Sequence, residues 1–524
     1  MGGGMRMTVD KADLVLHDGC ILGHPESDSV AISGGLVVAH GHYRDLKPLV
    51  GPRTHLIPLT GRTVTPGFID CHLHFMEGAS VAAGLSVLRC RTIEELLADL
   101  RVGTGKSPPG NWLRAFGCDE ALLRDRRSPT REELDLAVPK NPLRLRHQTL
   151  HGSWLNSRAI GLLGLERDDF APQAGAFIAR DATGRLTGFV AGMEEWISNR
   201  LPRVTPAELE ARARFFSREL ASAGITAFTD ATARNGLDEI SNLARLVAGG
   251  SICQRTSVMV GATNLNSLPA LGQIAASRGI GIPAVKFLDA VQWEIPHLVR
   301  TVADAMTAGM DCAFHATEVE ELETALHAIE SARDRVPQKA LERVVARVEH
   351  GGLIPPDYPE RIAALGVWVV TNPGFVYYRG AKYAGEPGLI PFLYRAKSLA
   401  AAGVSLAGGT DAPVTPARPL AAIAAAMARV SVEGYELAQA EILAPAESLA
   451  LFTSAAARLS RLAAGEISVG CLADLIVLPA DPLKLGPAEL LNLPVDLTII
   501  GGRVVYERGR PLAAQSPTAS LFSA

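Results

Sequence analysis

The stretch TPGFIDCHLH, residues 65–74, decides how the rest of the chain is interpreted. Its apolar part, Gly67 to Cys71, predicts a short buried strand, and two histidines stand at the end of that strand. Side chains two residues apart on a strand point to the same face, so the rings of His72 and His74 can converge on one metal ion, at Zn–N distances of about 2.1 Å. Such a pair also occurs on ordinary strand faces, so the remaining chain must decide between ligands and core histidines.

Seven further apolar runs follow, and several of them are followed by stretches with apolar residues at helical spacing, such as Val319 to Ile329. Strands that alternate with helices are typical of βα units around a parallel sheet. Eight units predict an α/β fold with a closed (β/α)8 TIM-like barrel, whose reactive side chains gather at the carboxyl ends of the strands. The predicted strands are Gly67 to Cys71, Ile225 to Asp230, Arg255 to Val260, Ala284 to Leu288, Asp311 to His315, Val345 to His350, Val367 to Thr371 and Val404 to Gly408.

The two ends of the chain predict a second, smaller domain. Leu14 to Leu22 reads as two strands around an Asp18-Gly19 turn, and Thr498 to Glu507 reads as two strands around Gly501-Gly502. Leu472 to Leu478 adds another strand. We therefore expect residues 1–65 and 460–524 to form one composite β-sandwich domain.

The interval between the first and second predicted barrel strands is too long for a simple crossover and contains the turn-rich segment Ser107-Pro108-Pro109-Gly110. We interpret residues 77–220 as an inserted cap. The first barrel strand then lies within residues 66–76, and the remainder of the catalytic barrel spans residues 221–459.

Composition excludes several classes of protein. The chain has 524 residues, 48% of them hydrophobic and 20% charged, and 51 Lys and Arg against 55 Asp and Glu leave a formal charge of -4. These values are typical of a globular protein. They give no large excess of positive charge that would bind nucleic acid or an anionic membrane. Seven scattered cysteines form no C-x-x-C pair, and no apolar run is long enough for a membrane span. We expect a cytoplasmic protein that acts on a small molecule and could form a homo-oligomer.

Four further polar residues stand on other predicted strands. His315, His350 and Asp411 follow apolar runs, where a lone histidine is most often a hydrogen-bonded core residue. Lys286 lies inside the run AVKFL, where an unpaired ammonium is costly, so a salt bridge to Asp289 or to a buried acid is the ordinary explanation. Together with the first two histidines, these residues favour a polar site at the strand ends.

The chain resembles the amidohydrolase superfamily, specifically the amidohydrolase-3 branch that includes N-substituted formamide deformylase. The resemblance extends over nearly the whole chain. The motifs that carry it are VTPGFIDCHLH, NWLRAFGCDE, HGSWLNS from His151, VKFLD around Lys286, VEHG around His350, GGTDAPV around Asp411 and GEISVGCLADLIVL.

This resemblance implies that His72, His74 and Asp411 bind one divalent metal ion and that His315 and His350 bind a second. Lys286, carboxylated by CO2 on Nζ, would bridge them. The ions, one or two per chain, would be Zn, with Fe, Mn, Co and Ni open. A metal-bound hydroxide would attack the substrate, with Asp411 as general acid and base.

Two departures from the branch concern the substrate pocket. The branch usually has Ala-Ile-Gly-Asp after the histidine of the fifth strand, whereas this chain has Ala316-Thr317-Glu318. Thr149-Leu150 replaces a common Asp-Gly before His151. Our hypothesis is a metal-dependent hydrolase of a linear or N-substituted, non-peptide amide; the alternatives are a deaminase of an amino-heterocycle that uses Glu318, and a non-catalytic scaffold. The predicted substrate contacts are Trp112, His151, Glu318 and Asn372.

Overall fold

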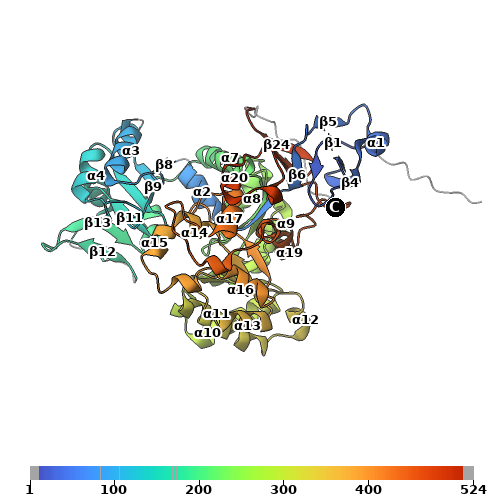
Figure 1. Ribbon diagram of the computed structural model, residues 1–524. Helices are drawn as coiled ribbons and strands as arrows, with labels where there is room; N and C mark the ends of the chain where they lie inside the picture. Colours follow the sequence, from blue (N-terminus) through green and yellow to red (C-terminus); the bar gives the residue numbers. More distant parts are fainter. Residues whose placement is uncertain (1–10, 83, 106, 168–169, 172–174, 511–524) are drawn as a thin grey trace, which may run out of the picture. The chain divides into compact units, whose positions relative to one another are not determined.

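The computed structural model describes residues 11–510, apart from residues 83, 106, 168–169 and 172–174. The chain divides into two compact units (Figure 1). The first contains residues up to His74, Ser217–Asp411 and the chain from Ala417 onward. The second contains Phe75–Phe216 and Ala412–Pro416.

All eight predicted barrel strands are present in the first unit, and all pair in parallel. Two sheets hold them, in the orders β15-β14-β7 and β16-β17-β18-β19-β20-β21. The run Arg255 to Val260 is divided at Met259 into two strands, one in each sheet. The strands are β7 (Phe68–Leu73), β14 (Ile225–Asp230), β15 (Arg255–Val258), β16 (Val260–Gly261), β17 (Ala284–Phe287), β18 (Asp311–Ala316), β19 (Ala346–His350), β20 (Trp368–Thr371) and β21 (Leu406–Gly408).

The last strand returns to the first. The amide of Asp411 donates to the carbonyl of His72 at 2.7 Å, and the amide of Gly409 donates to the carbonyl of Thr371 at 3.0 Å. A Cβ atom added to Gly409 would lie 2.6 Å from the Cβ of His72, so only glycine permits this close approach. The carboxyl ends of β7, β20 and β21 therefore meet.

Helices follow most barrel strands, and their apolar faces pack on the sheet. Residues Val302 of α10, Leu326 of α11 and Val348 of β19 share one buried core, in which the rings of Phe287 and Phe314 stack at 4.6 Å. The helical prediction for Val319 to Ile329 is confirmed by α11. The main helices of this unit are α8 (Leu237–Ala248), α9 (Leu268–Arg278), α10 (Ile295–Thr307), α11 (Val319–Arg333), α13 (Tyr358–Ala364), α16 (Ala396–Ala401), α17 (Pro419–Ala428) and α19 (Ser454–Ser460).

Strands from both ends of the chain lie together in two further sheets (Figure 1). They share a core that contains Leu16, Val30, Val64 and Leu475. One sheet has the order β4-β3-β1-β5 and the other β2-β6-β22-β23-β24. The strands are β1 (Leu14–His17), β2 (Cys20–Ile21), β3 (Ser29–Ser33), β4 (Leu36–Gly41), β5 (His55–Pro58), β6 (Thr63–Pro66), β22 (Leu475–Leu478), β23 (Leu497–Ile500) and β24 (Arg503–Glu507).

One of the two predicted hairpins is wrong. β23 and β24 pair around Gly501-Gly502, both in the left-handed region, as expected. β1 and β2, in contrast, belong to different sheets, because the chain at Asp18-Gly19 crosses from one sheet to the other and β2 pairs with β6. The turn signal was correct, but it does not specify which strands pair.

The second unit contains a six-stranded sheet in the order β12-β13-β11-β10-β9-β8. Leu96, Leu100, Leu145 and Trp154 are buried in a core on this sheet. We predicted an insertion over residues 77–220; its role as a cap stays a prediction. The elements are β8 (Leu85–Ser86), β9 (Leu113–Cys118), β10 (Leu143–His147), β11 (Gly152–Leu155), β12 (Phe177–Arg180) and β13 (Leu186–Ala191), with helices α2 (Phe75–Ala82), α3 (Ile93–Gly105), α4 (Arg131–Ala137) and α5 (Ser157–Leu163).

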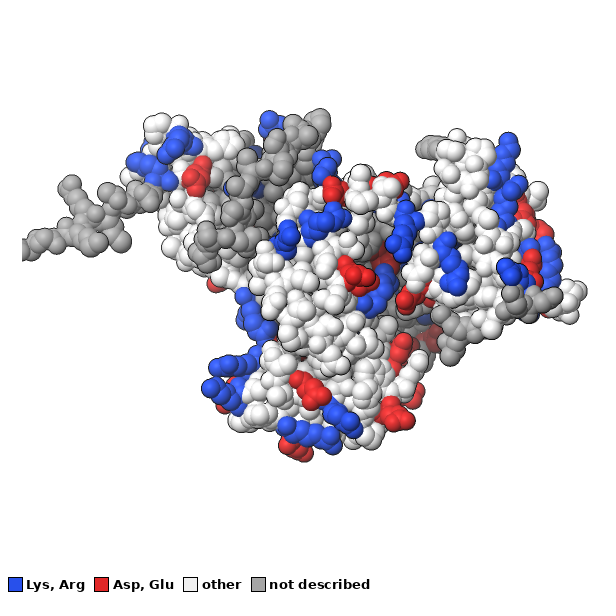
Figure 2. Space-filling view, turned by 180° about the vertical axis from the view of Figure 1, so that it is seen from behind, with Lys and Arg blue, Asp and Glu red and all other residues white. Residues whose placement is uncertain are grey.

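Surface charge is mixed. On the face seen in Figure 2, basic and acidic side chains are interspersed. Within the described residues, none of the helices has the length and apolar character that a membrane crossing needs.

Candidate metal centre

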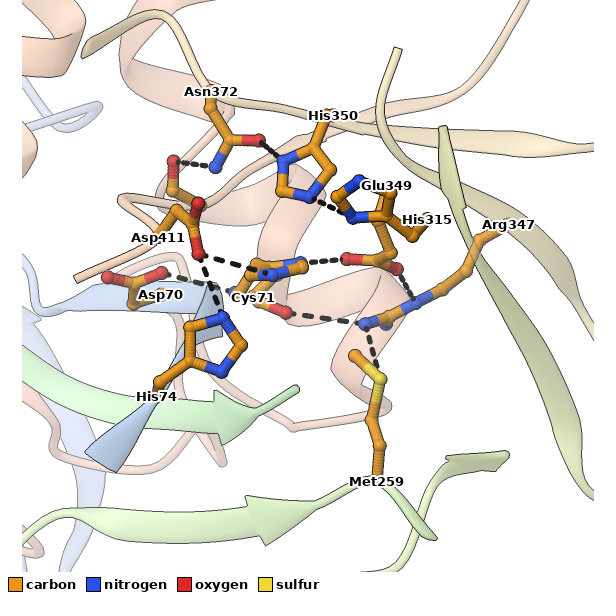
Figure 3. Close-up of polar contacts among 12 residues, drawn as sticks. Asp70, Cys71, His74, Met259, His315, Arg347, Glu349, His350, Asn372 and Asp411 are labelled. Atoms are coloured by element: carbon orange, nitrogen blue, oxygen red, sulfur yellow. Dashed lines mark hydrogen bonds and ion pairs between the residues drawn. The ribbon is translucent and has the colours of Figure 1, made fainter. Parts of the chain in front are cut away.

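His72 and His74 lie at the end of β7 and approach one carboxylate, that of Asp411. Figure 3 shows Asp411 beside His74. Nε2 of His74 lies 3.0 Å from Asp411 Oδ1, and Nε2 of His72 lies 3.5 Å from the same oxygen. This oxygen is buried, and no group of the described residues lies in hydrogen-bond geometry with it. Asp411 has a φ of 58°, a strained conformation for a residue other than glycine, which is often found at functional sites. Two imidazole nitrogens and one carboxylate oxygen are suitable ligands for a divalent ion.

His315 and His350 form a second pair at the ends of β18 and β19. Nε2 of His350 lies 3.1 Å from Nδ1 of His315, and Nδ1 of His350 lies 2.8 Å from the amide oxygen of Asn372. Because that oxygen can only accept, Nδ1 of His350 donates and Nε2 keeps its lone pair. Asn372 also donates to the carbonyl of Gly409 at 2.8 Å. Asn372 therefore orients His350, and its predicted contact with substrate stays a prediction.

Lys286 lies in β17 with a side chain that is almost completely buried. Among the described residues, its Nζ has no hydrogen-bond partner, and Lys286 makes no ion pair with Asp289, so the ordinary explanation by a salt bridge to that residue is wrong. Burial lowers the pKa of Lys286 to about 8. A buried amine without a partner is costly unless it is modified or neutral.

Burial and neighbouring charges give these groups protonation states that suit metal binding. Burial, together with the charge of Lys286, holds the pKa values of His72 and His350 well below their ordinary value. Both rings are therefore neutral and can offer a lone pair. Burial acts to raise the pKa of Asp411, but the contact with His74, together with the charges of His72 and Lys286, outweighs burial and the pKa is lowered. The same contact raises the pKa of His74 against the effect of burial.

Asp70 is a residue that the sequence did not single out. It is fully buried in β7 and accepts hydrogen bonds from the amide of Thr410 at 3.0 Å and from its hydroxyl at 2.5 Å. Burial raises its pKa to about 7 despite these bonds. Asp70 thereby fixes the segment that ends in Asp411. A polar residue inside the first apolar run was the only available sequence signal.

Glu318 is exposed at the N-terminus of α11, whereas Glu321 faces the histidine pair. Glu321 Oε1 lies 3.9 Å from His315 Nε2, and Oε2 accepts from the amides of Thr317 and Glu318 at 2.7 and 3.0 Å. The predicted role of Glu318 at the substrate stays a prediction. Glu318, the acid at the predicted spacing, is thus one helical turn away from Glu321, the acid that approaches His315.

The other two predicted substrate contacts belong to the second unit. Trp112 is half-buried against a core that includes Leu155, and His151 is exposed. Their contact with substrate stays a prediction.

A separate polar group, Asp119, Glu120 and His147, also lies in the second unit. Nε2 of His147 lies 3.8 and 3.7 Å from the two carboxylates, while Nδ1 accepts from the amide of Thr149 at 3.0 Å. Because Nδ1 accepts, the neutral ring carries its hydrogen on Nε2, directed at the acids. This arrangement suits a hydrogen-bond donor better than a metal ligand.

A parallel barrel with buried, neutral histidines and a carboxylate at its strand ends defines a class of metal-dependent hydrolases. The model of the amidohydrolase family matches residues 55–506, and the chain belongs to this family. It is an enzyme that hydrolyses carbon–nitrogen bonds with a divalent metal.

Two relatives match most of the chain, and a solved structure has a similar fold. N-substituted formamide deformylase of Arthrobacter pascens is 26% identical, over 92% of this chain and 95% of the relative. The putative amidohydrolase YtcJ of Bacillus subtilis (strain 168) is also 26% identical, over 92% and 96%. An uncharacterized metal-dependent hydrolase from Pyrococcus horikoshii OT3 has a similar fold, with a TM-score of 0.70 at 22% identity, over 91% of this chain and 99% of that one.

Proposed function

We propose that this enzyme hydrolyses a linear or N-substituted, non-peptide amide, with two zinc ions joined by carboxylated Lys286. The observation that carries the proposal is the buried Nζ of Lys286, which has no hydrogen-bond partner within the described part of the chain although its charge acts on His72 and His350. A bare ammonium there would repel metal ions. Conversion to a carbamate would remove that charge and supply two ligand oxygens.

The modification follows from the chemistry of the amine. Neutral Nζ attacks the carbon of CO2: an N–C bond forms, the electron pair of one C=O π bond moves onto oxygen, and one proton leaves the nitrogen for solvent. Because the pKa of Lys286 is lowered to about 8, about a tenth of the amine is neutral at pH 7, against less than about 0.1% for an ordinary lysine. The protein environment thus favours carboxylation.

The donor set fits divalent ions. One ion would be held by His72, His74 and Asp411, and the other by His315 and His350. Carboxylated Lys286 would be a ligand of both ions. Ions held there would supply Lewis-acid chemistry, polarising the substrate carbonyl and lowering the pKa of water. Asp411 takes the proton of the attacking water at its buried carboxylate and delivers it to the leaving nitrogen as the C–N bond breaks. Carboxylate and amine are the products.

The test is a panel of N-formyl and N-acyl amines together with aminopyrimidines and triazines, with carboxylate, amine and ammonia measured separately. We expect amide hydrolysis that falls by about 10² or more in Asp411→Asn and changes little in Glu318→Gln. Ammonia released from the heterocycles, and lost in Glu318→Gln with one metal per chain, would establish the deaminase instead. A metal-loaded protein with neither activity would contradict the amide assignment.

A further inference from the structure

Two buried charged side chains, Arg347 and Glu349, form a row beside the candidate metal centre (Figure 3). Glu349, in β19, is completely buried and contacts Nδ1 of His72 with Oε2. Its other oxygen, Oε1, accepts from Nε of Arg347 at 2.5 Å. Arg347 is also buried, and its Nη2 donates to the carbonyl of Cys71 at 3.3 Å. The row thus connects β19 to the strand that carries His72.

Stability alone does not explain this row. Replacing a buried ion pair with apolar residues is often neutral or stabilising, so such a pair is weak evidence for a stabilising role. Arg347 and Glu349 are two residues apart on one strand, so they could pair without a third group. Glu349 nevertheless directs its second oxygen at the ring of His72, and this side chain is not exposed to solvent.

The chemistry of the contact fixes the state of the ring. An ionised carboxylate can only accept, so Nδ1 of His72 must carry the hydrogen and Nε2 must keep its lone pair. Nε2 is the nitrogen that faces Asp411, at 3.5 Å. In metal sites, a carboxylate on the far nitrogen of a histidine fixes both the tautomer and the ring orientation.

We propose that Glu349 is a positioning residue that presents Nε2 of His72 to a divalent metal, and that Arg347 keeps Glu349 in place. This inference rests on the proposed assignment of His72 as a ligand. It adds two residues that do not themselves contact the metal or the substrate.

The substitution Glu349→Gln tests the proposal. If the amide oxygen of glutamine faces His72, its NH2 group meets the donor Nε of Arg347; if it is turned round, His72 must place its hydrogen on Nε2. Zinc affinity, measured by competition with a chelator, should fall about 10- to 100-fold. The visible spectrum of the cobalt-loaded protein should change with it.

Two further variants separate positioning from folding. Arg347→Met combined with Glu349→Gln removes the opposing donor, so the amide oxygen can accept from His72 and metal affinity should partly recover. Glu441→Gln is the matched control, because Glu441 is also buried and accepts from Ser398 and Arg395. That control should keep the parent affinity. Circular dichroism verifies that each variant is folded.

The outcomes are distinct. Folded Glu349→Gln with zinc affinity and a cobalt spectrum equal to those of the parent would overturn the proposal, as would a double variant that binds no better than Glu349→Gln. If Glu349→Gln does not fold, the folded double variant decides: a zinc affinity below that of the parent together with a changed cobalt spectrum supports the proposal, and an affinity and a spectrum equal to those of the parent overturn it. A parent protein that binds no metal through His72 would overturn the ligand assignment itself.

Discussion

Replacing Lys286 with methionine should stabilise the metal-free protein, although most core substitutions destabilise. Methionine fills a similar volume without a charge. The lysine pKa of about 8 lies below the ordinary 10.5, and this difference corresponds to about 3 kcal/mol of unfavourable burial at pH 7. For a chain of 524 residues that unfolds cooperatively, 3 kcal/mol raises the Tm by about 3 °C.

The pH dependence of this gain has a definite sign. Below pH 8 the amine is protonated in both the folded and the unfolded states, so the whole cost is present. Between pH 8 and 10.5 the folded protein releases the proton while the unfolded chain keeps it, so the parent becomes more stable as the pH rises. The advantage of Lys286→Met should therefore be largest at pH 7 and shrink above pH 8.

The assay is thermal unfolding of metal-stripped protein in buffer free of CO2, with Lys484→Met, an exposed lysine, as the control. Added bicarbonate should stabilise the parent and leave Lys286→Met unchanged, because only the parent can form the carbamate. A Lys286→Met protein less stable than the parent at pH 7 in the absence of CO2 would refute the reasoning. Equal responses of both proteins to bicarbonate would refute the carbamate.

Three further predictions concern the metals, the second unit and CO2. Replacing both His72 and His74 with alanine should remove most of the metal and the activity; elemental analysis that finds undiminished metal would contradict the ligand assignment. Trp112→Ala and His151→Ala should raise KM or change the order of preferred substrates at unchanged metal content, and unaltered kinetics in both would remove these residues from the pocket. The initial rate of carboxylation of Lys286 in metal-free protein, followed with ¹³C-labelled CO2 at a fixed concentration of dissolved CO2, should increase with pH and level off just above pH 8, because it follows the neutral fraction of the amine, whereas a rate that continues to rise to pH 10 would show an ordinary lysine.

The barrel strands could be predicted because buried parallel strands are continuous apolar runs. The strand Ile225 to Asp230 was predicted with both ends correct. The other predicted strands differ from the observed ones by one or two residues at one or both ends. The division at Met259 was missed because an apolar residue between two strands carries no breaking signal. The predicted pairing of the strands around Asp18-Gly19 was wrong for a related reason. A turn signal shows where the chain changes direction, but it does not show which strand becomes the partner.

The candidate site was predicted in part for a similar reason. Histidines at strand ends are conspicuous, so His72, His74, His315 and His350 could be found along the chain. The carboxylate of Glu349 could not, because its partner His72 is 277 residues away and only the folded barrel brings them together. The sequence indicates which residues are candidate metal ligands, whereas the groups that orient those residues depend on tertiary contacts.

A crystal structure of the zinc-loaded protein, with anomalous scattering to locate the metal, tests the central claim most directly. The account predicts two ions, one bound by His72, His74 and Asp411 and one by His315 and His350, with density for a carboxylate on Nζ of Lys286 between them. A single ion beside an unmodified Lys286 would contradict it.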